Sequence, residues 1–191
     1  MIWLVTMVFL TTQIANGFIE LFVQAMVSTT TRWLCGGNMF VHLDYANHRE
    51  SKDLDVFVVL NVPKGICKNR VVWRKGKEPN VVIKLLSSTL TQDKNEKKPG
   101  YQNQLRVKGY FWFNPLNPEN WAGSSLQCGA YQELPVDKNG RLISQQLGLA
   151  LIRWPGCYED LDTIWLRWET LDGVLLLAPQ EIPKQAEVKA Q

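Results

Sequence analysis

The chain has 191 residues, of which 46% are hydrophobic and 20% charged, and its net charge is +3 at neutral pH. This length suits one domain with a hydrophobic core, and the composition excludes a disordered chain. The mildly basic balance permits a nucleic-acid partner without requiring one. The cysteines are widely spaced and no histidine stands at zinc spacing from them, so we expect buried or incidental thiols and a reducing, cytoplasmic compartment.

The first segment of the chain is apolar, with no charged residue before Glu20. A run of this length can span a bilayer, but polar residues interrupt it and no basic residue precedes it. Its apolar residues recur at helical spacing, which favours a buried amphipathic helix over 1–33 as part of the domain. A membrane segment and a misassigned start are the two alternatives.

Strand patterns dominate the segment that follows. Apolar or alternating runs bounded by turn residues occur at 38–44, 55–60, 70–74, 80–87 and 110–113. The segment 87–105 is polar and rich in lysine, and it predicts a helix that Pro99-Gly100 interrupts.

The second half of the chain has the pattern of a β-meander. Short strands are predicted around Ser125 and Tyr131, at 149–154 and at 164–168, separated by turns at 128–129, 139–140, 155–156 and 172–173. The segment 179–191 is a polar tail that predicts a frayed helix or disorder. We therefore expect an α/β domain over 34–178, with a mixed sheet flanked by helices and a β-rich C-terminal half.

One residue stands out within these strands: Lys84 lies in the middle of the apolar run 80–87, and Asp55 opens the run 55–60. A magnesium-dependent phosphodiesterase needs carboxylates that share the ion, with a lysine nearby to stabilise developing charge. One compact solution is an Asp at the start of one strand and Glu-x-Lys on its neighbour, because residues two apart on a strand share a face.

Several segments together resemble a known family. In order and spacing, they are similar to the bacterial putative restriction endonuclease family of the PD-(D/E)xK nuclease superfamily: 36–41, 55–60, 71–73, 79–86, 96–98, 110–115 and 137–149. The resemblance extends over 36–168 and implies a restriction-endonuclease-like fold that hydrolyses DNA with Mg²⁺. DNA is thus the partner we consider, no nucleotide cofactor is expected, and a homodimer is left open.

The resemblance also assigns roles to individual positions. Asp55 matches the family's first metal-binding aspartate, while Lys84 stands where the family has its second metal-binding carboxylate, a glutamate. Lys97 matches the lysine from the following helix that would stabilise charge. Asn80 and Asn114 stand where the family has aspartates. The resemblance therefore implies a degenerate site with Asp55 as the remaining metal ligand, and Mg²⁺ binding that is lost or weak.

Two questions stay open at the level of sequence. Lys84 has two expected arrangements, an ion pair with Asp55 or a snorkelling side chain whose ammonium group reaches water. The function is either that of an impaired nuclease or that of a non-catalytic, nuclease-like module that binds DNA or a protein. A competent nuclease would need a replacement carboxylate, for which Glu96 and Asp93 are the nearest candidates. Whether the chain is an enzyme is thus uncertain.

Overall fold

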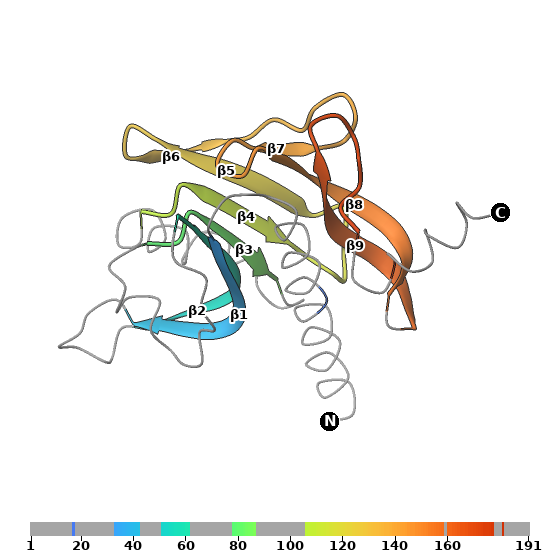
Figure 1. Cartoon of the computed structure of the whole chain (residues 1–191), viewed down its shortest axis with the longest axis horizontal. Coiled ribbons are helices and arrows are strands. Elements are labelled where there is room, and N and C mark those ends of the chain that lie inside the picture. Colours follow the sequence, from blue (N-terminus) through green and yellow to red (C-terminus); the bar gives the residue numbers. More distant parts are fainter. Residues whose placement is uncertain are drawn as a thin grey trace.

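The computed structural model describes residues 17, 33–42, 51–61, 78–86, 106–158, 160–177 and 181. The elements within these residues are strands, and they form two sheets (Figure 1). The first sheet has six strands in the order of the chain: β1 (Trp33–His42), β2 (Ser51–Leu60), β3 (Val81–Leu85), β4 (Gly109–Phe113), β5 (Trp121–Gln127) and β6 (Ala130–Glu133). The second has three: β7 (Leu142–Ser144), β8 (Leu149–Tyr158) and β9 (Leu161–Thr170).

The first sheet is mixed, as the sequence predicted. β3 and β4 are parallel, whereas the other neighbouring strands of this sheet are antiparallel. Antiparallel neighbours need only a short turn, whereas a parallel pair needs a crossover of a dozen or more residues. The chain between Leu85 and Gly109 has that length. β3 and β4 form the centre of the sheet (Figure 1).

The hydrophobic core lies between the two sheets. Val56, Ile83 and Phe111 are register partners across β2, β3 and β4, so they share one face of the first sheet. They belong to the same buried cluster as Trp165 and Trp168 of β9, and Phe111 meets Trp168 edge to face with ring centroids 6.0 Å apart. Because side chains alternate along a strand, Asp55 and Lys84 lie on the opposite face.

The α/β prediction is wrong for the described part of the chain. There, no helix flanks the sheet, and only the isolated positions Gly17 and Glu181 are helical. One face of the first sheet packs against β7–β9, because the C-terminal meander folds into a sheet of its own. In the described residues, no helix has the length and apolar character to cross a bilayer.

The expected helix over 1–33 lies outside the described residues except at its end and at one internal position. β1 begins at Trp33, the last residue assigned to that helix. Gly17 lies against the rings of Tyr158 and Trp165, so closely that a Cβ at Gly17 would come within 3.0 Å of the Tyr158 ring. The predicted strand at 70–74 and the predicted helix at 87–105 are also outside the described residues.

The β-rich C-terminal half is confirmed, with one correction to its turns. Cys128 and Gly129 have φ of 49° and 83° and form the two-residue turn of the β5–β6 hairpin, where positive φ matches the twist of the strands. The turn predicted at 155–156 is wrong, because β8 continues to Tyr158. Pro155 is tolerated there because β8 pairs with β7 only over 149–151, so Pro155 has a ladder partner on β9 alone.

Candidate functional site

The candidate site lies where β2 and β3 separate. The two strands pair only over 56–58 and 81–83, and beyond Val56 the strand β2 remains paired with β1. Asp55 and Lys84 are the next positions on the two strands, beyond the last ladder pair. The fork between the strands therefore brings these two side chains together on the face that points away from the second sheet.

Asp55 and Lys84 form a buried ion pair. Lys84 Nζ donates to Asp55 Oδ1 at 2.8 Å, and the exposed fractions of the two side chains are 7% and 13%. The backbone N–H of Leu85 donates to Asp55 Oδ2 at 2.5 Å. Of the two arrangements expected for Lys84, the structure thus has the ion pair, and both oxygens of the carboxylate accept hydrogen bonds from β3.

The surroundings of Lys84 explain why the pair forms. Strand alternation places Val82 and Leu86 on the same face as Lys84, and these side chains are 0% and 3% exposed. An ammonium group buried among such neighbours costs several kcal/mol unless a counter-charge with good hydrogen-bond geometry compensates it. Asp55 supplies that counter-charge from the adjacent strand.

Asn80 plays a comparable part at the other end of the same ladder. Its side-chain Oδ1 accepts the backbone N–H of Leu60 at 2.8 Å, and its own N–H donates to the carbonyl of Val58 at 2.8 Å. Asp55 and Asn80 therefore bracket the short β2–β3 ladder, each with a side-chain oxygen that accepts a backbone N–H of the opposite strand. An aspartate at position 80 would offer the same oxygen.

Asn114, the third position at which the resemblance implies an acid, caps a turn. Its Oδ1 accepts the backbone N–H groups of Leu116 at 2.9 Å and of Asn117 at 3.2 Å. Asn and Asp both stabilise turns in this way, because the acceptor is the oxygen that they share. At positions 80 and 114 the amide thus preserves the structural role that an aspartate would have.

The groups at the fork do not fit a divalent cation. Mg²⁺ prefers hard oxygen ligands, whereas here one carboxylate faces an ammonium group and a peptide N–H, both of which repel a cation. In the described ranges, no three His, Cys, Asp or Glu residues come together as a metal-binding group would require. The donor set suits a structural ion pair.

The other predicted site residue, Lys97, lies outside the described residues, as do the alternative acids Glu96 and Asp93. Their roles stay predictions. Sequence reasoning missed Trp112, which pairs in register with Lys84 across β3 and β4 and is half-buried. It also missed the N–H of Leu85, because a backbone donor has no signature in the sequence.

The comparisons with known proteins agree with the resemblance drawn from the segments. A family model named Uma2, described as putative restriction endonuclease, matches residues 6–155, which is more than half of the chain. No curated protein matches this chain. The match includes both Asp55 and Lys84 and confirms a restriction-endonuclease-like, nuclease-type family. The chain therefore belongs to the Uma2 putative restriction endonuclease family.

Proposed function

We propose that this protein is a restriction-endonuclease-type nuclease domain whose Mg²⁺-dependent hydrolysis of DNA is impaired, because Lys84 takes the place of the second metal-binding carboxylate. The observation that carries the proposal is the 2.8 Å contact between Lys84 Nζ and Asp55 Oδ1. Family membership supports the nuclease type, and the ion pair supports the impairment. The proposed site consists of Asp55 and Lys84, with Lys97 as the residue that would stabilise charge on a phosphate.

The size of the electrostatic change supports a large effect on metal binding. Glutamate to lysine changes the local charge by two units, and two unit charges about 4 Å apart interact by roughly 4 kcal/mol at an effective dielectric constant near 20. A divalent ion carries two charges, so its repulsion by the ammonium group is about twice that energy; since each 1.4 kcal/mol is about tenfold in affinity, binding at Asp55 weakens by several orders of magnitude. A buried pair of this kind can be neutral for stability, but it occupies the Asp55 carboxylate that an ion would need.

The alternative is a non-catalytic module that binds DNA or a protein partner. Its support is that Asp55, Asn80 and Asn114 each accept a backbone N–H, so all three side chains have structural roles. Binding to DNA through basic side chains would weaken steeply with salt and would not need a divalent ion. Fluorescence anisotropy with labelled duplex DNA, measured across a salt series in EDTA, identifies this activity.

Plasmid cleavage in Mg²⁺ or Mn²⁺ tests the nuclease proposal. We expect no cleavage by the wild-type chain above the background of Asp55→Asn, and a gain of cleavage in Lys84→Glu that increases when Asn80→Asp is added. Lys84→Gln is the matched control, because it removes the ammonium group without adding a carboxylate.

The opposite results also have clear meanings. Metal-dependent cleavage by the wild type that Asp55→Asn abolishes would contradict the impairment, and would show that another carboxylate completes the site. Folded Lys84→Glu and Lys84→Glu/Asn80→Asp variants without cleavage would favour the non-catalytic module.

A further inference from the structure

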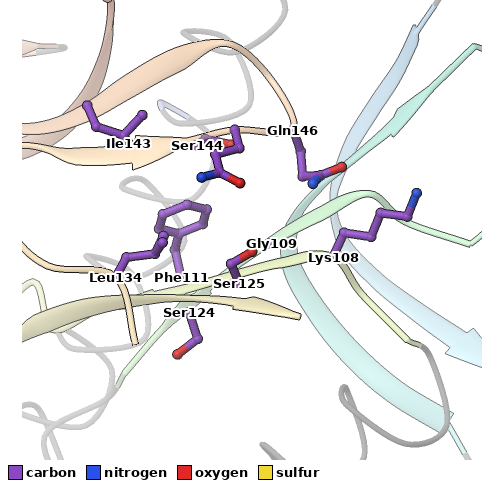
Figure 2. A pocket seen from close by; sticks show the side chains of 10 residues that line it. Lys108, Gly109, Phe111, Ser124, Ser125, Leu134, Ile143, Ser144 and Gln146 are labelled. Atoms are coloured by element: carbon purple, nitrogen blue, oxygen red, sulfur yellow. The ribbon is translucent and has the colours of Figure 1, made fainter. Parts of the chain in front are cut away.

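A small pocket lies between β5 of the first sheet and β7 of the second, and neither Asp55 nor Lys84 is among its lining residues (Figure 2). It has room for about one water molecule. Ser125 and Ser144 line it from the two sheets, Phe111 lies at its apolar side, and Gln146 lies at its rim. A pocket of this size, with a serine from each sheet in its lining, suits a single small polar molecule.

Ser144 contributes a buried hydroxyl group to the pocket. Ser144 and Leu142 share one face of β7, and Leu142 belongs to the core between the sheets, so Ser144 points toward the first sheet. The residue is 2% exposed, and its Oγ has no hydrogen-bond partner among the described residues. A buried hydroxyl group in that condition is unfavourable unless a further donor or acceptor reaches it.

Ser125 offers the matching hydroxyl group from the other sheet. It pairs in register with Gly109 of β4, and both positions lie on the face that carries Phe111. Because Gly109 has no side chain, the space beside the Ser125 hydroxyl stays open toward β7. Ser125 is 8% exposed, so bulk water does not readily serve this group.

We propose that the pocket binds one ordered water molecule, which joins the hydroxyl group of Ser144 to that of Ser125 and so links the two sheets. Each hydroxyl group can donate or accept, and buried water molecules typically make about three hydrogen bonds. The side-chain amide of Gln146 at the rim is the third partner. The pocket does not suit an anion, because the ammonium group of Lys108 points away from it (Figure 2).

Thermal unfolding of the full-length chain tests this bridge through four variants: Ser144→Ala, Ser125→Ala, the double variant and Ser124→Ala. Ser124 precedes Ser125 on β5 and also borders the pocket, but its side chain points to the opposite face, so it is the control for the general effect of Ser→Ala (Figure 2). We expect each of Ser144→Ala and Ser125→Ala to lower Tm by more than Ser124→Ala does. The decrease in Tm of the double variant should be no larger than the larger decrease of the two single variants, because one water molecule serves both residues.

An unpaired hydroxyl group would behave in the opposite way. Removing Ser144 Oγ would then raise Tm or leave it unchanged, and either result overturns the proposal, as do losses that add in the double variant. A high-resolution crystal structure gives an independent check: a water molecule about 3 Å from both hydroxyl oxygens is expected, and its absence overturns the proposal. None of these variants alters Asp55 or Lys84, so the result does not depend on the proposed function.

Discussion

Asp55 and Lys84 form a hydrogen-bonded ion pair that closes the fork between β2 and β3, with 2.8 Å between Oδ1 and Nζ. The same carboxylate accepts the N–H of Leu85 at 2.5 Å, where the ladder between the strands has ended. Asp55 is therefore both the counter-ion of a buried lysine and the acceptor of a backbone group of β3. These two roles give the residue a structural function that does not involve a metal.

Removing the charge of Asp55 should destabilise the fold strongly. Asp55→Asn keeps an oxygen for Leu85 but leaves the buried Lys84 ammonium without this counter-charge, which typically costs about 3–5 kcal/mol. Urea unfolding measures the loss. Asp162→Asn, an exposed position on β9, is the control and should change the unfolding free energy by less than about 0.5 kcal/mol. Equal effects of the two substitutions would contradict the structural role of the pair.

An apolar residue at position 84 should rescue the Asp55 variant. In Asp55→Asn/Lys84→Met neither member of the pair is charged, and replacing a buried ion pair by neutral groups of similar volume is often neutral or stabilising. We expect the double variant to recover most of the loss of Asp55→Asn in the same unfolding experiment. A double variant that is less stable than Asp55→Asn would show that the ammonium group of Lys84 stabilises the strand through other contacts.

The oxygen of Asn80 should matter more than its amide nitrogen. Asn80→Ala removes the acceptor of the Leu60 N–H and should cost about 1 kcal/mol, whereas Asn80→Asp keeps the acceptor and should cost less. Chemical unfolding of the two variants side by side measures the difference. If Asn80→Asp lowered the unfolding free energy more than Asn80→Ala, the hydrogen bond from the Leu60 N–H would not be the main contribution of this side chain to stability.

A second ion pair, with a buried arginine, holds a residue of the C-terminal segment. Arg167 is 2% exposed, donates to both carboxylate oxygens of Glu181 at 2.7 and 2.6 Å, and lies over the ring of Trp154 at 4.6 Å. Glu181→Gln should therefore lower the unfolding free energy by about 1.5–3 kcal/mol.

The exposed ion pair of Arg153 with Glu119 provides the control for this effect. Glu119 is 77% exposed, so Glu119→Gln should change stability by less than about 1 kcal/mol in the same urea titration. If Glu181→Gln lowered the unfolding free energy as little as Glu119→Gln, residue 181 would not anchor the C-terminal segment.

Asp137, in the turn before β7, should make the stability of the fold decrease at acidic pH. Partial desolvation acts to raise the pKa of this carboxyl group. Hydrogen bonds from the Arg141 side chain and from the N–H groups of Arg141 and Asn139 outweigh the desolvation, so the pKa lies below its ordinary value. A carboxyl group whose pKa is lower in the folded than in the unfolded state stabilises the fold. This contribution is complete above the unfolded pKa of about 4, and it is lost as the pH falls through the folded pKa. Asp137→Asn should flatten the acid side of a Tm–pH curve, and an unchanged acid limb would contradict this assignment.

The central parts of β2, β3 and β4 could be predicted because their apolar runs, 55–60, 80–87 and 110–113, end at clear turn residues. The start of β1 at Trp33 could not, because the predicted strand begins only at residue 38. The pairing of Asp55 with Lys84 was one of two expected arrangements, and burial among Val82 and Leu86 decides between them. The second sheet could not be foreseen as the cover of the first, because periodicity gives the strands but not the layer on which they pack. The place of Trp112 beside Lys84 depends on a parallel register between distant segments, which the sequence does not encode locally.

Calorimetric titration of Mg²⁺ into the full-length wild-type chain and into Lys84→Glu is the most direct test of the central claim, that Lys84 replaces a metal-binding carboxylate. We predict no measurable binding to the wild type, binding to Lys84→Glu together with a Mg²⁺-dependent rise in Tm, and no binding to Asp55→Asn/Lys84→Glu, which lacks the retained carboxylate. Mg²⁺ binding to the wild type as tight as binding to Lys84→Glu, and lost in Asp55→Asn, would contradict the account.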